Sequence, residues 1–285
     1  MLLCQQTSQA VVLNVNSSQN GLDIVQATYQ LNGSTVTQNS SNTGTTIRGD
    51  DPLILTTLTI NDGGTNVTLD NFNTGGVQAV NLNFPANPSG FEVVDGENTI
   101  NTDDLVAFGD AVENVFSNTN LRNYVNKSSS APAAPFPGND FDIVYQFGLT
   151  EDDYLIVQER DGNSSVTLEA LDSSGNIIAG SDTLFFTGGS TSPYQWDTGY
   201  GTIEDPFGDQ SLQLAVVDVA LFNTTETIFG IRITNGSGAD IKILSASSDD
   251  FTNNPINPAI PEPSTYGLIL GCFSLILTIF NRRRR

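Results

Sequence analysis

The sequence predicts an all-β body, an antiparallel sandwich or jelly roll, with one short amphipathic helix and a C-terminal transmembrane helix. Many short segments alternate apolar and polar residues, and clusters of Gly, Asn, Asp and Ser separate these segments. A single segment in the first half has helical spacing of its apolar residues. Closely spaced strands with such turns are typical of β-sandwiches.

The alternation predicts strands on both sides of the middle of the chain. In the second half, the clearest alternating segments are 141–147, 166–170, 231–233 and 241–243, with turns at 161–163, 172–176 and 235–238. In the first half, strands are expected over Ala10–Val15, Leu22–Leu31, Leu53–Ile60 and Val77–Phe84.

The helix is expected at about residues 102–117. Asn101 or Thr102 would cap its N-terminus, and Asp103 and Asp104 would lie in the first turn, where acidic side chains favour the helix dipole. Its apolar face would hold Leu105, Phe108, Val112, Val115 and Phe116. We expect this helix to pack over the edge or end of a sheet.

The chain divides by composition into consecutive regions. A β-rich region, 1–128, contains the helix; a Pro/Ala/Ser stretch, 129–138, is a linker or a long loop; and a second β region covers 139–250. A polar tail, 251–265, a membrane helix, 266–281, and an arginine cluster, 282–285, complete the chain.

Composition excludes several classes of function. The chain has no histidine, which removes Ser-His-Asp and Cys-His catalysis and every histidine-ligated metal site. The first 261 residues carry 6 Lys and Arg against 31 Asp and Glu, so a nucleic-acid partner is not expected. The two cysteines, Cys4 and Cys272, cannot form a disulfide within the body, since only one lies in it. We therefore expect a protein that is not an enzyme.

The C-terminal tail has three parts in order. Pro261-Glu262-Pro263 comes first, and prolines keep such a segment extended. The apolar run of 15 residues from Tyr266 to Phe280 follows, about 22 Å long as a helix at ~1.5 Å per residue. Its Gly267 and Gly271 form a spacing that lets another helix approach closely. Finally, Arg282, Arg283, Arg284 and Arg285 would hold the C-terminus in the cytoplasm and place the body on the other side of the membrane.

This tail resembles the PEP-CTERM sorting signal of exported bacterial proteins, over residues 261–285. The resemblance implies that exosortase, a membrane-embedded sorting protease, recognises the tail and cuts near Pro261-Glu262-Pro263. It also implies that the body is a candidate for glycosylation. The Asn-x-Ser/Thr triplets are not evidence for this, because a chain so rich in Asn, Ser and Thr contains many of them by chance. The alternative is a simple tail anchor in which the Pro-Glu-Pro occurs by chance. Residues 1–7 have no basic or apolar stretch, so we expect a signal peptide upstream of them.

Two groups of side chains in the body are candidate ligand contacts. Glu151, Asp152 and Asp153 could supply oxygen ligands to calcium, or simply form a solvated acidic loop. Tyr194, Trp196 and Tyr200 could stack on a sugar ring, or the tryptophan could belong to the core.

The sequence therefore predicts an exported protein of the cell surface or extracellular matrix. Its role would be structural or adhesive, in a layer associated with exopolysaccharide, with the membrane and exosortase as partners before processing. One alternative is a carbohydrate-binding module or lectin that uses Tyr194, Trp196 and Tyr200. The other is a polysaccharide hydrolase, which would need two carboxylates facing each other across a cleft.

Overall fold

The computed structural model describes residues 9–15, 22–83, 91–95, 98–100, 104–127, 140–189, 192–202, 210–235, 239–249 and 251. The described chain is mostly β-strand with one α-helix, which confirms the predicted all-β class. The predicted linker, 129–138, and the tail from 252 onward lie outside these residues. No helix in the described part of the chain is long and apolar enough to cross a membrane, and the predicted membrane helix at 266–281 falls beyond that part.

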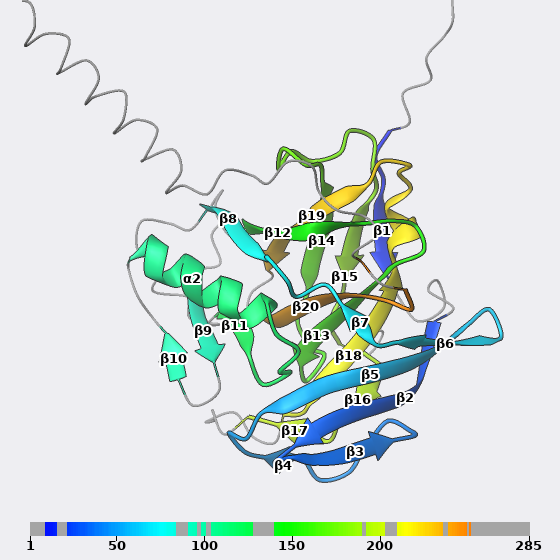
Figure 1. Cartoon of the computed structure of the whole chain (residues 1–285), viewed down its shortest axis with the longest axis vertical. Helices are drawn as coiled ribbons and strands as arrows, with labels where there is room; N and C mark the ends of the chain where they lie inside the picture. Colours follow the sequence, from blue (N-terminus) through cyan, green and yellow to red (C-terminus); the bar gives the residue numbers. More distant parts are fainter. Residues whose placement is uncertain are drawn as a thin grey trace, which may run out of the picture. The chain divides into compact units, whose positions relative to one another are not determined.

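The described residues form three larger sheets and one two-stranded sheet (Figure 1). The six-stranded sheet has the order β1 (Val12–Val15), β15 (Thr183–Phe186), β14 (Val166–Leu171), β19 (Ile228–Asn235), β12 (Asp140–Leu149), β8 (Gln78–Asn83). The eight-stranded sheet has the order β10 (Asn98–Ile100), β9 (Phe91–Asp95), β11 (Tyr124–Lys127), β20 (Asp240–Ser247), β13 (Tyr154–Arg160), β18 (Leu212–Asp218), β16 (Trp196–Asp197), with β7 (Asn71–Phe72) beside β20. The four-stranded sheet has the order β3 (Ser34–Gln38), β2 (Leu22–Leu31), β5 (Leu53–Asp62), β6 (Thr65–Leu69).

The pairing is antiparallel almost throughout, as predicted. The exceptions among the described strands are β1 beside β15 and the small pair β4 (Ile47–Arg48) with β17 (Tyr200–Gly201), which are parallel. Strands from before and after residues 129–138 share the two larger sheets, and Met1–Pro255 forms one compact unit.

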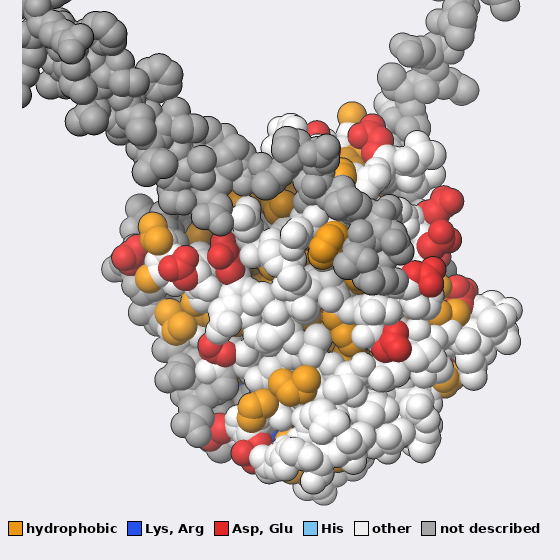
Figure 2. All heavy atoms as spheres, in the orientation of Figure 1, with side chains coloured by type: hydrophobic (Ala, Val, Ile, Leu, Met, Phe, Trp, Pro, Cys, Tyr) orange, Lys and Arg blue, Asp and Glu red, His pale blue; other side chains and the backbone are white. Residues whose placement is uncertain are grey.

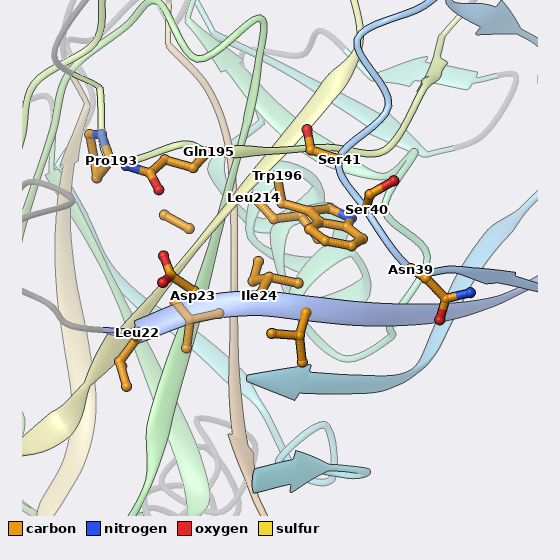
Figure 3. A pocket seen from close by; sticks show the side chains of 13 residues that line it. Leu22, Asp23, Ile24, Asn39, Ser40, Ser41, Pro193, Gln195, Trp196 and Leu214 are labelled. Carbon is orange, nitrogen blue, oxygen red and sulfur yellow. The ribbon is translucent and has the colours of Figure 1, made fainter. Parts of the chain in front are cut away.

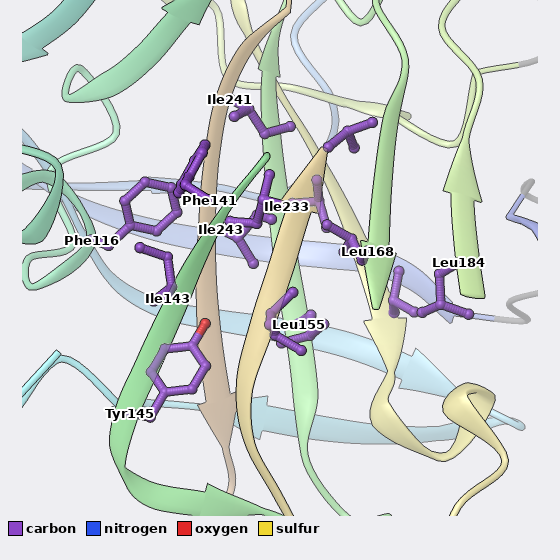
Figure 4. Close-up of a cluster of buried hydrophobic side chains, with 14 of the residues drawn as sticks. Phe116, Phe141, Ile143, Tyr145, Leu155, Leu168, Leu184, Ile233, Ile241 and Ile243 are labelled. Atoms are coloured by element: carbon purple, nitrogen blue, oxygen red, sulfur yellow. The ribbon is translucent and has the colours of Figure 1, made fainter. Parts of the chain in front are cut away.

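Two hydrophobic cores lie on opposite faces of the eight-stranded sheet. The large core fills the space between this sheet and the six-stranded sheet, with Phe141, Ile143, Leu168 and Ile233 on one side and Leu155, Val157, Ile241 and Ile243 on the other (Figure 4). The small core joins the same sheet to the four-stranded sheet through Tyr29, Leu55, Leu58, Ile60, Ile156, Trp196, Leu214 and Leu244. The eight-stranded sheet is therefore covered on both faces.

Covering both faces changes what the central strands can contain. Every residue of β13 and of β20 is buried, including Gln158, Glu159 and Lys242. By contrast, β5 alternates buried and half-buried residues over most of its length, as expected of a strand with one solvated face. Alternation in the sequence therefore predicted part of β20, at 241–243, but it did not predict β13, nor that the polar Lys242 between two isoleucines is buried.

The helix α2 (Leu105–Phe116) confirms the predicted element and shifts its start. Phe108, Val112, Val115 and Phe116 are buried in the large core, as expected from their spacing. The predicted caps Asn101 and Thr102 are wrong: Asp104 is the N-cap, and its side chain accepts from the N–H groups of Val106 and Ala107. A short carboxylate directly before the first apolar residue supplies the oxygen that these free N–H groups need.

Candidate functional site

The three aromatic residues proposed for sugar stacking do not form one exposed surface. Trp196 is 3% exposed and belongs to the small core, and Tyr194 is 5% exposed and belongs to the large core. The ring of Tyr194 lies beside Phe186, with 6.2 Å between the ring centroids. Only Tyr200 is half-exposed. The burial of both other rings counts against a flat stacking platform.

Trp196 and Tyr200 are nevertheless brought together by a residue that the sequence did not single out, Tyr29 on β2. The indole Nε1 of Trp196 donates a hydrogen bond to the Tyr29 hydroxyl at 3.1 Å. Tyr200 packs edge-on against the Tyr29 ring at 6.2 Å. Burial raises the pKa of the Tyr29 hydroxyl well above its ordinary value, so it stays protonated.

The segment after β3 lines pockets together with Trp196 and Tyr200, and it is hydrogen-bonded to β16. The carbonyl of Asp197 accepts from Asn42 N and from Gln38 Nε2, and Asp197 N donates to Ser41 Oγ at 2.9 Å. Gly199 has a φ of +70°, and a Cβ at this position would collide with Asn42. The turn at residues 197–199 therefore requires glycine to let the two segments approach.

A pocket of about 350 Å³ lies on one side of this segment, between β2 and the strands β16 and β18 (Figure 3). Its apolar lining includes Trp196, Leu214 and Ile24, while its polar side chains are those of Asp23, Asn39, Ser40, Ser41 and Gln195. The pairing register of β2 with β5 shifts between Ile24 and Gln26, which is a bulge at the wall of the pocket. In the described structure, β3 pairs with β2 only from Ala27 onward, so residues 22–26 form an open strand edge there.

A second pocket, of about 470 Å³, lies on the other side of the same segment. Tyr200, Thr198, residues 36–38 and residues 40–44 line it. Neither of these two pockets is lined by a pair of carboxylates, since Asp23 is the one acidic residue among their linings. They therefore do not supply the two facing acids that the hydrolase alternative requires.

The hydrogen bond between Tyr29 and Trp196 gives a direct prediction. Replacing Tyr29 with Phe should lower the free energy of unfolding by about 1–2 kcal/mol, because the buried indole N–H loses its acceptor. Urea unfolding followed by the fluorescence of the sole tryptophan measures this change. Tyr200→Phe, the same change on a more exposed ring, should cost less. Equal effects of the two changes would contradict the assignment.

The acidic residues proposed for calcium occupy the turn between β12 and β13. Glu151 and Asp152 are exposed, whereas Asp153 is buried and closes the turn by accepting from Thr150 N at 2.7 Å and from Thr150 Oγ1 at 3.1 Å. No group of three or more Asp, Glu, His or Cys that could hold a metal ion is found among the described residues.

Charged residues inside the body were not predicted from the sequence. Arg160 pairs with Asp240 at 2.9 Å, and Arg232 makes a two-pronged pair with Asp142 at 2.8 and 2.9 Å. Each pair joins neighbouring parts of one sheet, so only the register of the strands reveals the partners. Lys242 is fully buried as well and contacts no carboxylate within ion-pair distance among the described residues.

Comparison with known proteins assigns neither a family nor a fold to the chain. No protein-family model and no curated protein matches the chain. One solved structure to which it is similar is the N-terminal domain of an adhesin of Streptococcus gordonii, at 11% identity and a TM-score of 0.10, with 85% of this chain and 61% of that chain covered. The chain thus spans about 61% of that domain's length, and a TM-score of this size does not indicate a shared fold.

Proposed function

We propose that the protein is exported to the cell surface or the extracellular matrix and that its role there is structural or adhesive. The observation that carries the proposal is the order of three features at the C-terminus. These are Pro261-Glu262-Pro263, the apolar segment 266–281 and the cluster Arg282–Arg285. In this proposal, segment 266–281 spans the membrane until exosortase cuts near the prolines, with the arginines in the cytoplasm.

The body is compatible with such a role. Two filled cores on either side of one sheet make a rigid β structure that needs no disulfide. On the face shown in Figure 2, acidic side chains are scattered while basic ones are nearly absent. A surface of one charge keeps a protein soluble, and it disfavours close association with anionic polymers. We therefore propose a neutral or weakly charged exopolysaccharide as the surrounding layer.

Surface display can be tested with a tag in the exposed turn at Gly63 and Gly64, which joins β5 to β6. On intact cells of the native host, an antibody should reach the tag without lysis. Replacing Arg282–Arg285 with glutamine should reduce this labelling, because the charges that orient the tail are lost. The matched control is Arg48→Gln, which removes a positive charge from the body and should leave the labelling unchanged. Labelling that appears only after lysis would contradict the proposal.

A second candidate function is binding of a saccharide unit, and the pocket beside Trp196 favours it. The pocket combines an indole with side-chain amide, hydroxyl and carboxylate groups, a mixture that suits a sugar ring. Polysaccharide added to the protein should change the emission of Trp196, and Asp23→Ala with Gln195→Ala should abolish that change. Asp152→Ala, outside the pocket, is the control. Emission that never responds, across neutral and acidic polysaccharides, would exclude this function.

A further inference from the structure

Lys242 lies in β20, inside the eight-stranded sheet, and none of its surface is exposed. Its Nζ donates to the carbonyl oxygen of Val115 in the last turn of α2 and to Oδ1 of Asn118, just past the helix, at 3.2 Å. Among the described residues it makes no ion pair. The amine is therefore held against neutral oxygen atoms, away from water.

This environment favours the uncharged form of the amine. Burial lowers the pKa of Lys242 to about 7, and the charge of Asp95 opposes the shift. A large share of the side chain is then neutral near pH 7 and carries the lone pair that a nucleophile needs. An exposed lysine would hold almost no neutral amine at the same pH.

In the reaction proposed below, the side-chain amide of Asn118, whose Oδ1 accepts from Lys242 Nζ, is the electrophile. Its Oδ1 accepts a second hydrogen bond, from the backbone N–H of Asn120 at 2.9 Å. When an amine attacks the amide, negative charge develops on Oδ1. The Asn120 N–H would stabilise that charge by its hydrogen bond, as the donors of an oxyanion hole do. The Nδ2 atom donates to the carbonyl of Asn114, which fixes the plane of the amide.

Asp95, on strand β9, contacts residues close to Asn118 in the sequence. Its carboxylate accepts from the side-chain amides of Asn114 and Asn123, on either side of Asn118 in the sequence. Its negative charge also favours the cationic nitrogen that forms when an amine attacks a carbonyl.

We propose that Lys242 and Asn118 join in an intramolecular amide bond, formed by the folded protein itself. Nζ of Lys242 attacks Cγ of Asn118, a bond from Nζ to Cγ forms, and the bond from Cγ to Nδ2 breaks. One proton moves from Nζ to Nδ2, and ammonia leaves. The step is neither an oxidation nor a reduction, and it needs no co-reactant.

The bond would link the central sheet to the loop after α2. It would close a long loop in the unfolded chain, as a disulfide does, in a body where no disulfide is available. The proposal does not depend on where the protein is located in the cell.

Mass spectrometry of the purified full chain tests this directly. The intact mass should be lower than that of the sequence by one ammonia. Digestion with trypsin should leave the bond after Lys242 uncut and release one branched peptide that contains both residues. Asn118→Ala and Lys242→Arg should each restore the full mass and the unlinked peptides. Asn66→Ala, in the exposed hairpin of β5 and β6, should keep the link.

The wild-type protein alone is decisive, so a variant that fails to fold does not affect the outcome. A folded wild-type chain of full mass, cut by trypsin after Lys242 once denatured, would overturn the proposal. Lys242 would then be a non-covalent partner of the helix C-terminus. Loss of ammonia without the branched peptide would overturn it equally, because that loss would come from another asparagine.

Discussion

Replacing Arg160 with methionine is expected to lower the free energy of unfolding by about 3–5 kcal/mol, the range for breaking a buried ion pair. The Arg160 guanidinium donates to Asp240 at 2.9 Å, and both side chains are almost fully buried. It also lies over the ring of Tyr124, at 5.8 Å from the centroid. Methionine keeps much of the volume but removes the ion pair of the buried Asp240 carboxylate.

The double variant Arg160→Met with Asp240→Leu separates the charge effect from packing. Because it removes both charges, it should recover most of the loss, as replacement of a whole buried pair often does. Urea unfolding of the wild type, both single variants and the double variant gives the coupling energy. A loss below about 1 kcal/mol in the Arg160→Met single variant, typical of exposed pairs, would show that the pair is solvated.

Stability should fall as the pH rises from about 4.5 to about 8, through Glu159. Burial, followed by the charge of Asp240, raises the pKa of this carboxyl from 4.5 to about 8. Between these two values the folded state holds a proton that the unfolded state has lost, so raising the pH favours unfolding. With about 1.4 kcal/mol for each unit of pKa difference, the full effect is at most about 5 kcal/mol.

The variant Glu159→Gln isolates this effect because glutamine cannot titrate. We expect it to be more stable than the wild type at pH 8 and close to it at pH 4, by urea unfolding at both values. Lys242 changes the free energy of unfolding in the opposite direction. Because burial lowers its pKa to about 7, its contribution makes stability rise with pH, and only above about pH 7. A Lys242 that is linked to Asn118 would not titrate at all. A difference between variant and wild type that does not change with pH would contradict the buried, protonated carboxyl.

The sequence predicted the outer parts of this fold better than its centre. The strand Leu22–Leu31 was predicted with its observed bounds, and the helix face was correct, because each of these elements has one solvated side that shows in the pattern. The strand β13 has no solvated side, and its Gln158, Glu159 and Arg160 resemble the end of a surface strand. Their burial follows from a second sheet packing on the far face, which no local pattern reveals.

The contacts within the candidate site could not be predicted from local sequence patterns either. Trp196 stands out in the sequence as the sole tryptophan, and a place in the core is one of the two roles predicted for it. Its partner Tyr29 is far away in the sequence, and only the packing of the four-stranded sheet on the eight-stranded sheet joins the two. Lys242 and Asn118 are similarly distant, and their contact depends on where α2 ends.

Mass spectrometry of the mature protein from its native host is the most direct test of the proposal that the tail directs export of the body. We expect a surface or extracellular protein whose C-terminus lies near Pro261-Glu262-Pro263 and which lacks the segment from Tyr266 to Arg285. A cytosolic protein that still ends at Arg285 would contradict it.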